Sequence, residues 1–181
     1  TIGNNSTIRE YVTISRGTED KMTTSIGENC LIMAYSHIAH DCIIGNNCVI
    51  VNGVQIAGHV KIDKYAIIGG GTLVHQFVKI GEHSMVAGGS LIRKDVPPFC
   101  KAGKEPLSYG GVNSIGLKRR DFSSDQINEI QNIYRILYLE GRNNSQAIEK
   151  IEKDIPKSNE KNTVLNFIKN SERGIIKGLL D

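Results

Sequence analysis

Features that would point to a membrane, a secretory route or a nucleic acid are missing or weak in this sequence. The 181 residues contain no apolar run long enough to cross a bilayer, and no signal peptide opens the chain. The formal net charge of +3 is mild and argues neither for nor against nucleic acid. We therefore expect no transmembrane segment. The sequence shows no feature that calls for nucleic acid, and we expect no nucleic-acid partner.

Cysteine is also scarce, with four residues in the whole chain. Cys30, Cys42 and Cys48 fall on positions that the repeat described below turns inward. We interpret them as small core residues rather than as disulfides, metal ligands or nucleophiles. Reduced structural thiols are typical of the cytoplasm, so we expect a cytoplasmic protein.

An aliphatic residue recurs every six residues through the first half of the chain. Stepping by six from Ile2 to Ile92, fifteen of sixteen positions hold Ile or Val, although these two types make up only 37 of the 181 residues. The residue four places later in each hexad is small, and Gly often follows the aliphatic residue. Helices and ordinary strands repeat every 3.6 and 2 residues, so neither explains this pattern. The period indicates a parallel β-helix of hexapeptide repeats, with three hexads in each eighteen-residue coil.

The repeat divides the chain into three parts. Residues 1–98 are the predicted β-helix, which ends at Pro97 and Pro98 because proline removes a ladder donor. Residues 99–121 form a connector, and residues 122–181 show helical spacing. We expect Ser123 or Ser124 to cap the first helix and Ser145 the second. The predicted fold is therefore mainly β, with a small C-terminal α-helical domain.

Asp20 is the one position at which the hexad register fails. A charged side chain would not face the core unpaired, so we expect residues 15–25 to leave a corner as an outward loop. Such loops often line functional sites. The chain also starts in the middle of a repeat, which predicts an N-terminally shortened protein.

An eighteen-residue coil places residues eighteen apart above one another, and this map gathers histidines at one corner. The residues predicted to meet there over three coils are His40, Gly58 and Gln76 in one column, Asp41 and His59 in the next, His75 in the third, and His37 on the same coil as His40. The fifth histidine, His83, lies on another hexad, and we interpret it as a solvated surface residue.

Three chemistries fit this corner. His40 beside Asp41 fits a general base, three histidines fit an open zinc site, and the patch fits the binding of an anion. Gly58 favours acyl transfer, because its N–H is available to stabilise an oxyanion beside the base. No serine or cysteine of the patch points outward as a nucleophile, so direct transfer without an acyl-enzyme is the simpler mechanism.

Four blocks, in order, carry a resemblance to a known family. They are His37-Ile38-Ala39-His40-Asp41-Cys42, Ile56-Ala57-Gly58-His59-Val60, Val74-His75-Gln76-Phe77 and Gly116-Leu117-Lys118-Arg119-Arg120. Together they resemble the UDP-N-acetylglucosamine O-acyltransferases of lipid A biosynthesis. The resemblance implies a left-handed β-helix, a homotrimer and no cofactor. It also implies transfer of an (R)-3-hydroxyacyl group from acyl carrier protein to the 3-hydroxyl of UDP-N-acetylglucosamine.

The resemblance also implies roles for single residues. His40 would be the general base, Asp41 would orient its ring, and Gly58 would bind the oxyanion. The set implied to position the substrates is His37, His59, His75 and Gln76, and the set implied to contact the nucleotide is Asn113, Arg119 and Arg120. Gly88 matches the position that limits acyl-chain length, and a glycine there predicts a long hydroxyacyl chain.

This sequence departs from the family at several points. Ser15 stands where members carry a histidine, Ile115 stands where an acidic residue is common, and members have further coils upstream of Thr1. Three alternatives remain open at this point. They are a zinc enzyme like the γ-class carbonic anhydrases, the related N-acyltransferase of the same pathway, and an inactive nucleotide-sugar-binding scaffold.

Overall fold

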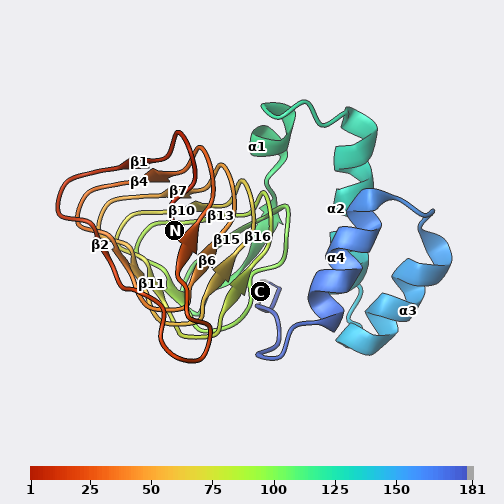
Figure 1. Cartoon of the computed structure of the whole chain (residues 1–181). Coiled ribbons are helices and arrows are strands. Elements are labelled where there is room, and N and C mark those ends of the chain that lie inside the picture. The colour runs from red at the N-terminus through yellow and green to blue at the C-terminus, as the bar shows by residue number, and fades with distance from the viewer. Residues whose placement is uncertain (179–181) are drawn as a thin grey trace.

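The computed structural model describes residues 1–178 and consists of a β-prism with a small helical domain beside it (Figure 1). Each of the first fourteen strands is two residues long, because every hexad turns a corner after its short strand. These strands are β1 (Thr7–Ile8), β2 (Thr13–Ile14), β3 (Ser25–Ile26), β4 (Leu31–Ile32), β5 (His37–Ile38), β6 (Ile43–Ile44), β7 (Val49–Ile50), β8 (Gln55–Ile56), β9 (Lys61–Ile62), β10 (Ile67–Ile68), β11 (Leu73–Val74), β12 (Lys79–Ile80), β13 (Met85–Val86) and β14 (Leu91–Ile92).

The strands stack into three sheets that form the sides of a left-handed parallel β-helix, as predicted. The seven-stranded sheet has the order β1-β4-β7-β10-β13-β15-β16, the five-stranded sheet β14-β11-β8-β5-β2, and the four-stranded sheet β12-β9-β6-β3. His37 pairs with Gln55 and Ile38 with Ile56. The predicted eighteen-residue offset is therefore the register of these coils.

The core of the prism consists of the aliphatic and small positions of the hexads. Ile32, Ile38, Ile50 and Ile56 are fully buried. The three cysteines predicted to be core residues are buried and free, as is Cys100. Filling a fixed cross-section with one large and one small side chain per hexad explains the strict repeat.

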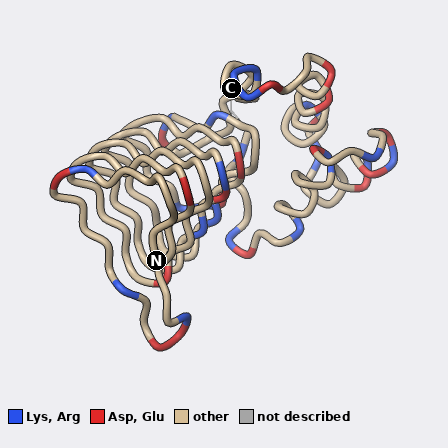
Figure 2. The backbone as a smooth tube through the Cα atoms, turned by 45° about the horizontal axis from the view of Figure 1, so that its top comes forward, with Lys and Arg blue, Asp and Glu red and all other residues tan. Residues whose placement is uncertain are grey.

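Residues 15–24 form a loop that leaves the prism, as the failure at Asp20 predicted; we call it the insertion loop. Figure 2 shows it projecting beyond the coils with charged residues at its tip. On its N-terminal side the register differs: Thr13 pairs with His37, twenty-four residues later instead of eighteen. The loop thus lengthens an eighteen-residue coil by six residues.

The corners of the prism are tight turns with left-handed backbone. Asp41, His59 and Phe77 occupy equivalent places with φ of 60°, 60° and 64°. Non-glycine residues adopt this region only at an energetic cost, and the stacking of successive coils compensates for that cost. We call the turns at residues 40–41, 58–59 and 76–77 the histidine corner; it joins the five-stranded sheet to the four-stranded sheet.

The segment expected to be an irregular connector adds further regular structure. β15 (Cys100–Gly103) pairs in parallel with β13, and β16 (Ser108–Val112) returns antiparallel to β15. The short helix α1 (Ser114–Lys118) follows. The seven-stranded sheet therefore continues beyond Pro98, where the hexads end.

Three helices form the C-terminal domain: α2 (Ser124–Tyr138), α3 (Asn144–Asp154) and α4 (Asn159–Lys169). Ser123 caps α2, as predicted. The prediction that Ser145 caps α3 is wrong, because Asn143 is the cap and forms a reciprocal pair with Gln146. In the described part of the chain, no helix is both long and apolar enough to cross a membrane.

Candidate functional site

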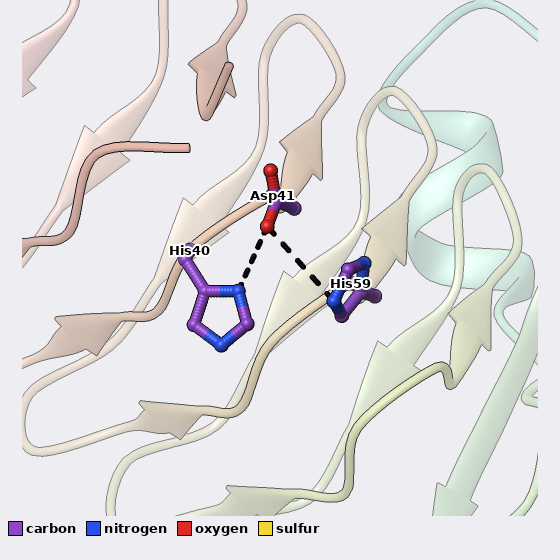
Figure 3. Close-up of side chains that lie close together, drawn as sticks. All are labelled: His40, Asp41 and His59. Atoms are coloured by element: carbon purple, nitrogen blue, oxygen red, sulfur yellow. Dashed lines mark hydrogen bonds and ion pairs between the residues drawn. The ribbon is translucent and has the colours of Figure 1, made fainter. Parts of the chain in front are cut away.

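His40 and Asp41 lie together at the histidine corner, where the chain passes from β5 to β6. His40 Nδ1 lies 2.8 Å from Asp41 Oδ2, as Figure 3 shows. The Asp41 side chain is fully buried, whereas 43% of the His40 side chain is exposed. Because the Asp41 carboxylate accepts the Nδ1–H of His40, Nε2 keeps its lone pair free for an incoming molecule.

Asp41 is held from several directions. Oδ1 accepts the Thr18 backbone N–H at 3.0 Å, and Oδ2 accepts the Thr18 hydroxyl at 2.5 Å. Its own N–H donates to Thr24 Oγ1 at 2.9 Å. Burial alone would raise the pKa of the Asp41 carboxyl, but hydrogen bonds from Thr18 and His40 and the nearby His59 imidazole lower it to about 2. Asp41 is therefore ionised at neutral pH.

Gly58 lies directly against the His40 ring, as the eighteen-residue map predicted. A β-carbon on Gly58 would stand 2.7 Å from His40 Cε1 and 2.8 Å from Nε2, so any side chain at 58 would force the His40 ring to move. The Gly58 N–H donates to no backbone carbonyl within residues 1–178. The absence of a side chain thus lets the His40 ring pack against Gly58, whose backbone N–H is unused by the backbone.

His59 closes the site on the next coil. Its ring meets that of His40 edge-on at 5.1 Å between centroids and stacks on Phe77 at 4.7 Å. His59 Nε2 lies 3.9 Å from Asp41 Oδ2, and Nδ1 lies 3.4 Å from Asp20 Oδ2. Donor atoms of His40, Asp41 and His59 lie within 4.8 Å of one another, close enough for a metal ion. We assign His40 and Asp41 to their mutual hydrogen bond and His59 to its longer charge contacts with Asp41 and Asp20.

The remaining polar residues of the corner surround this centre. His37 lies on β5 with Nδ1 2.7 Å from Thr13 Oγ1. His75 and Gln76 are exposed, and the His75 ring is held by the Gln76 carbonyl at 3.1 Å. All three therefore remain accessible, as residues that position a substrate must be.

The residues predicted to contact a nucleotide lie elsewhere in the chain. Arg119 is exposed at the end of α1. The Arg120 guanidinium lies 5.2 Å from the centre of the Tyr65 ring, at the corner between the four-stranded and seven-stranded sheets. Asn113 is buried and caps α1, and its Nδ2 donates to the His83 carbonyl at 3.0 Å. None of the three has a recorded contact with the histidine corner, so their nucleotide role remains a prediction.

The interpretation of His83 as a solvated surface residue is wrong. His83 is only 5% exposed. Its ring stacks on Tyr65 and Phe99 and meets Phe122 edge-on. Burial, together with nearby Arg120 and Lys64, lowers the pKa of His83 to about 4. It is thus a neutral histidine in the contact between the prism and the segment that leads into α2.

Gly88 lies on a third corner, between the seven-stranded and five-stranded sheets, and is exposed. Within one chain it is separated from the histidine corner by the whole width of the five-stranded sheet. No contact within the described part of the chain joins the two corners. The length-limiting role of Gly88 therefore remains a prediction.

Sequence reasoning did not find Thr18 and Thr24. Both lie within the predicted outward loop. Thr18 is exposed and donates its hydroxyl to Asp41 Oδ2, whereas Thr24 is buried and accepts the Asp41 N–H. The signal available was the register failure at Asp20, which marked the loop without showing where its side chains lie.

The arrangement suits proton abstraction beside a site of developing negative charge. A buried carboxylate orients the His40 imidazole, the imidazole side chain is partly exposed, and it packs against Gly58, whose backbone N–H is unused by the backbone. Those are the components of general-base catalysis with an oxyanion site.

Comparisons with known proteins agree with the resemblance seen in the sequence. A family model described as UDP N-acetylglucosamine O-acyltransferase, domain 2, matches residues 95–176, and a bacterial transferase hexapeptide model matches residues 23–58. The acyl-[acyl-carrier-protein]–UDP-N-acetylglucosamine O-acyltransferase of Psychromonas ingrahamii is 59% identical over 97% of this chain and 68% of its own length. The enzyme of the same name from a Sulfurihydrogenibium species is 58% identical over 96% of this chain and 65% of its own length.

Solved structures give the same result. The UDP-N-acetylglucosamine acyltransferase of Francisella novicida superposes with a TM-score of 0.94 at 40% identity, over 97% of this chain and 65% of that one. The Arabidopsis enzyme gives 0.90 at 32% identity, over the same shares. This chain spans about two thirds of the length of the relatives it matches. These relatives are acyltransferases, so the zinc-enzyme alternative is set aside. The chain belongs to the UDP-N-acetylglucosamine O-acyltransferase family.

Proposed function

We propose that this chain transfers an (R)-3-hydroxyacyl group from acyl carrier protein to the 3-hydroxyl of UDP-N-acetylglucosamine, in the first step of lipid A biosynthesis. One observation carries the proposal. The His40 imidazole, oriented by buried Asp41, lies against Gly58, whose backbone N–H is unused. That pairing meets both needs of acyl transfer to a hydroxyl.

In the proposed reaction, His40 Nε2 takes the proton of the sugar 3-hydroxyl as its oxygen attacks the thioester carbonyl. The new C–O bond forms, and the carbonyl oxygen becomes an oxyanion that accepts the Gly58 N–H. Collapse of this intermediate breaks the C–S bond. The carrier thiolate then takes the proton from His40, so the base is regenerated without any acyl-enzyme. The step balances without a cofactor, and we propose that none is needed.

Asp41 would stabilise the imidazolium that forms during attack and hold Nδ1 as the donor. Its carboxylate is already ionised and fixed, so no reorganisation is needed at that moment. His37, His59, His75 and Gln76 would position the substrates. The nucleotide would be bound by three connector residues, Arg119, Arg120 and Asn113.

We further propose that the protein works as a homotrimer. The outward positions of the seven-stranded sheet are apolar on successive coils: Leu31, Val49, Ile67 and Met85. A continuous apolar strip on one side of a prism is typical of a surface that another protein covers. A facing subunit would also bring a Gly88 corner toward a histidine corner and complete the acyl channel. The buried reduced thiols support a cytoplasmic location.

The test is a transfer assay with UDP-N-acetylglucosamine and (R)-3-hydroxyacyl carrier protein. We expect a product whose mass has increased by one acyl group and whose acyl link is cleaved by mild alkali, as an ester is. An alkali-stable amide would favour the N-acyltransferase alternative. A sugar nucleotide with hydrogen in place of the 3-hydroxyl is the control and should give no product. Absence of any transfer by the natural chain would favour the scaffold alternative.

A further inference from the structure

We propose that Thr18, on the insertion loop, is a positioning residue that fixes the Asp41 carboxylate in the orientation that His40 requires. The inference rests on the proposed function and adds a residue outside the four sequence blocks that mark the family. It concerns a residue that touches Asp41 rather than the substrate.

The geometry is a two-point clamp. The Thr18 backbone N–H reaches Oδ1 at 3.0 Å, and its hydroxyl reaches Oδ2 at 2.5 Å, so one residue binds both oxygens of the carboxylate. A carboxylate gripped on both oxygens cannot rotate about its terminal torsion, which is otherwise broad. Asp41 is therefore held in one plane.

The orientation of the Asp41 carboxylate plane determines how His40 is held. Asp41 Oδ2 is the oxygen that binds His40 Nδ1 at 2.8 Å, and it is the same oxygen that accepts the Thr18 hydroxyl. The carboxylate has no exposed surface through which water could replace a lost donor. Loss of the hydroxyl would leave Oδ2 short of one partner and Asp41 free to turn away from the imidazole.

The rest of the insertion loop supports the same arrangement. Thr24, at its C-terminal end, accepts the Asp41 N–H at 2.9 Å. Asp20, at its tip, lies 3.4 Å from His59 Nδ1. One loop thus contacts the side chain and backbone of Asp41 and the neighbouring imidazole. The hexad repeat alone supplies none of these contacts.

The test compares Thr18→Val, which keeps the shape and the backbone N–H but removes the hydroxyl, with Thr18→Ser, which restores it. Thr23→Val is the matched control, because Thr23 lies on the same loop, is exposed and makes no side-chain hydrogen bond with any other described residue. We expect Thr18→Val to lower kcat roughly 10- to 100-fold with KM nearly unchanged, an effect of the size seen when a metal-bound histidine or carboxylate loses its outer hydrogen-bond partner. Thr18→Ser should recover most of the loss, and Thr23→Val should behave as the natural chain.

A second measurement follows the Asp41 carboxyl carbon by NMR as pH is lowered. Because the Thr18 hydroxyl lowers the pKa of Asp41, Thr18→Val should move its midpoint up from about 2, whereas Thr23→Val should not. An unchanged kcat or an unchanged midpoint in folded Thr18→Val would overturn the inference. If the natural chain shows no transfer, the proposed function fails, and the NMR midpoint still decides whether Thr18 controls Asp41.

Discussion

The imidazole of His40 occupies the space that a β-carbon on Gly58 would need, with Cε1 and Nε2 only 2.7 and 2.8 Å from that position. The two residues are eighteen apart and lie on successive coils of the prism. Their contact explains why glycine is required at 58, since the φ of this residue is not in the left-handed region. Glycine is needed at position 58 because the His40 ring approaches so closely, and not because the backbone adopts an unusual conformation.

Gly58→Ala should therefore displace the His40 ring and reduce transfer. The added methyl group would displace the ring from its contact with Gly58, which changes the position of the base relative to the proposed oxyanion donor. We expect kcat to fall about 10²- to 10³-fold, similar to the loss of one oxyanion donor. Steady-state kinetics measures the effect.

Gly110→Ala is the matched control for that substitution, because a β-carbon there would meet only Lys101 backbone atoms at 3.6 and 4.0 Å. It should leave kcat unchanged. A Gly58→Ala protein with the natural rate would show that the contact with His40 is not needed for turnover.

Asp41→Asn should remove part of the acid sensitivity of folding. The pKa of Asp41 is lowered from 3.8 to about 2 in the folded protein, so the unfolded chain binds a proton first as pH falls. The stabilisation is fully present above about pH 4 and is lost as pH falls from 3.8 toward 2. Asn is the suitable replacement because it tolerates the left-handed backbone at this position.

Urea unfolding of the natural chain and of Asp41→Asn between pH 6 and pH 2 measures this difference. The gap in unfolding free energy should narrow as pH falls through the window. A gap that stays constant with pH would show that the Asp41 carboxylate is not specially stabilised.

His83→Phe should make folding less sensitive to mild acid. The pKa of His83 is lowered from 6.5 to about 4, so the contribution of the neutral ring is complete above pH 6.5 and is lost as pH falls toward 4. The unfolding free energy lost over this pH range is on the order of 3 kcal/mol. Phenylalanine fits the aromatic stack, and Phe77 and Phe99 already hold the same left-handed backbone at equivalent corners.

Thermal unfolding at pH 7 and pH 5 measures the effect. The natural chain should lose more stability between the two values than His83→Phe does. If both proteins lost the same stability between pH 7 and pH 5, His83 would have to be already protonated or solvated in the folded protein.

Gly88→Met should shift acyl preference toward shorter chains if the Gly88 corner ends the channel. The side chain would fill space at an exposed position. Its β-carbon would stand 3.0 Å from the Gly70 carbonyl oxygen, so the backbone must also shift by a few tenths of an ångström. Competition between acyl carrier proteins of different chain length measures the preference.

Gly88→Ala carries the same β-carbon contact without the long side chain, and it separates that strain from blockage of the channel. Methionine should shorten the preferred chain, while alanine should change it little. Identical selectivity in the natural chain and Gly88→Met would remove the length-limiting role.

The period of six predicted the prism because each coil must fill the same cross-section, and the same period placed His40 over Gly58. It could not reveal that the coil containing residues 15–24 is longer. Six inserted residues leave the hexad count in step, so the aliphatic positions continue on schedule while Thr13 pairs with a residue twenty-four places later. The repeat therefore marked residues 15–25 as an outward loop but did not show that Thr18 on that loop contacts Asp41.

Contacts between the prism and the C-terminal part were also outside the reach of the repeat. His83 occupies a corner that would be exposed in an isolated prism, and Phe122 and Arg120 from beyond the hexads cover it. The residues that begin helices were easier to predict, because Ser123 and Gln126 form a local capping pair. Asn143 was missed because Ser145, two residues later, has the same preference for caps.

The central claim is that His40 is the base, and His40→Ala measured in the transfer assay tests it most directly. The variant should stay folded with the mass in solution of the natural chain, because 43% of the His40 side chain is exposed, and its melting temperature should fall only modestly as Asp41 loses its imidazole partner. Turnover should fall about 10²- to 10⁴-fold, the usual contribution of a general base. His83→Phe, a histidine change outside the site, should keep the natural rate. A folded His40→Ala protein that transfers acyl groups at the natural rate would contradict the account.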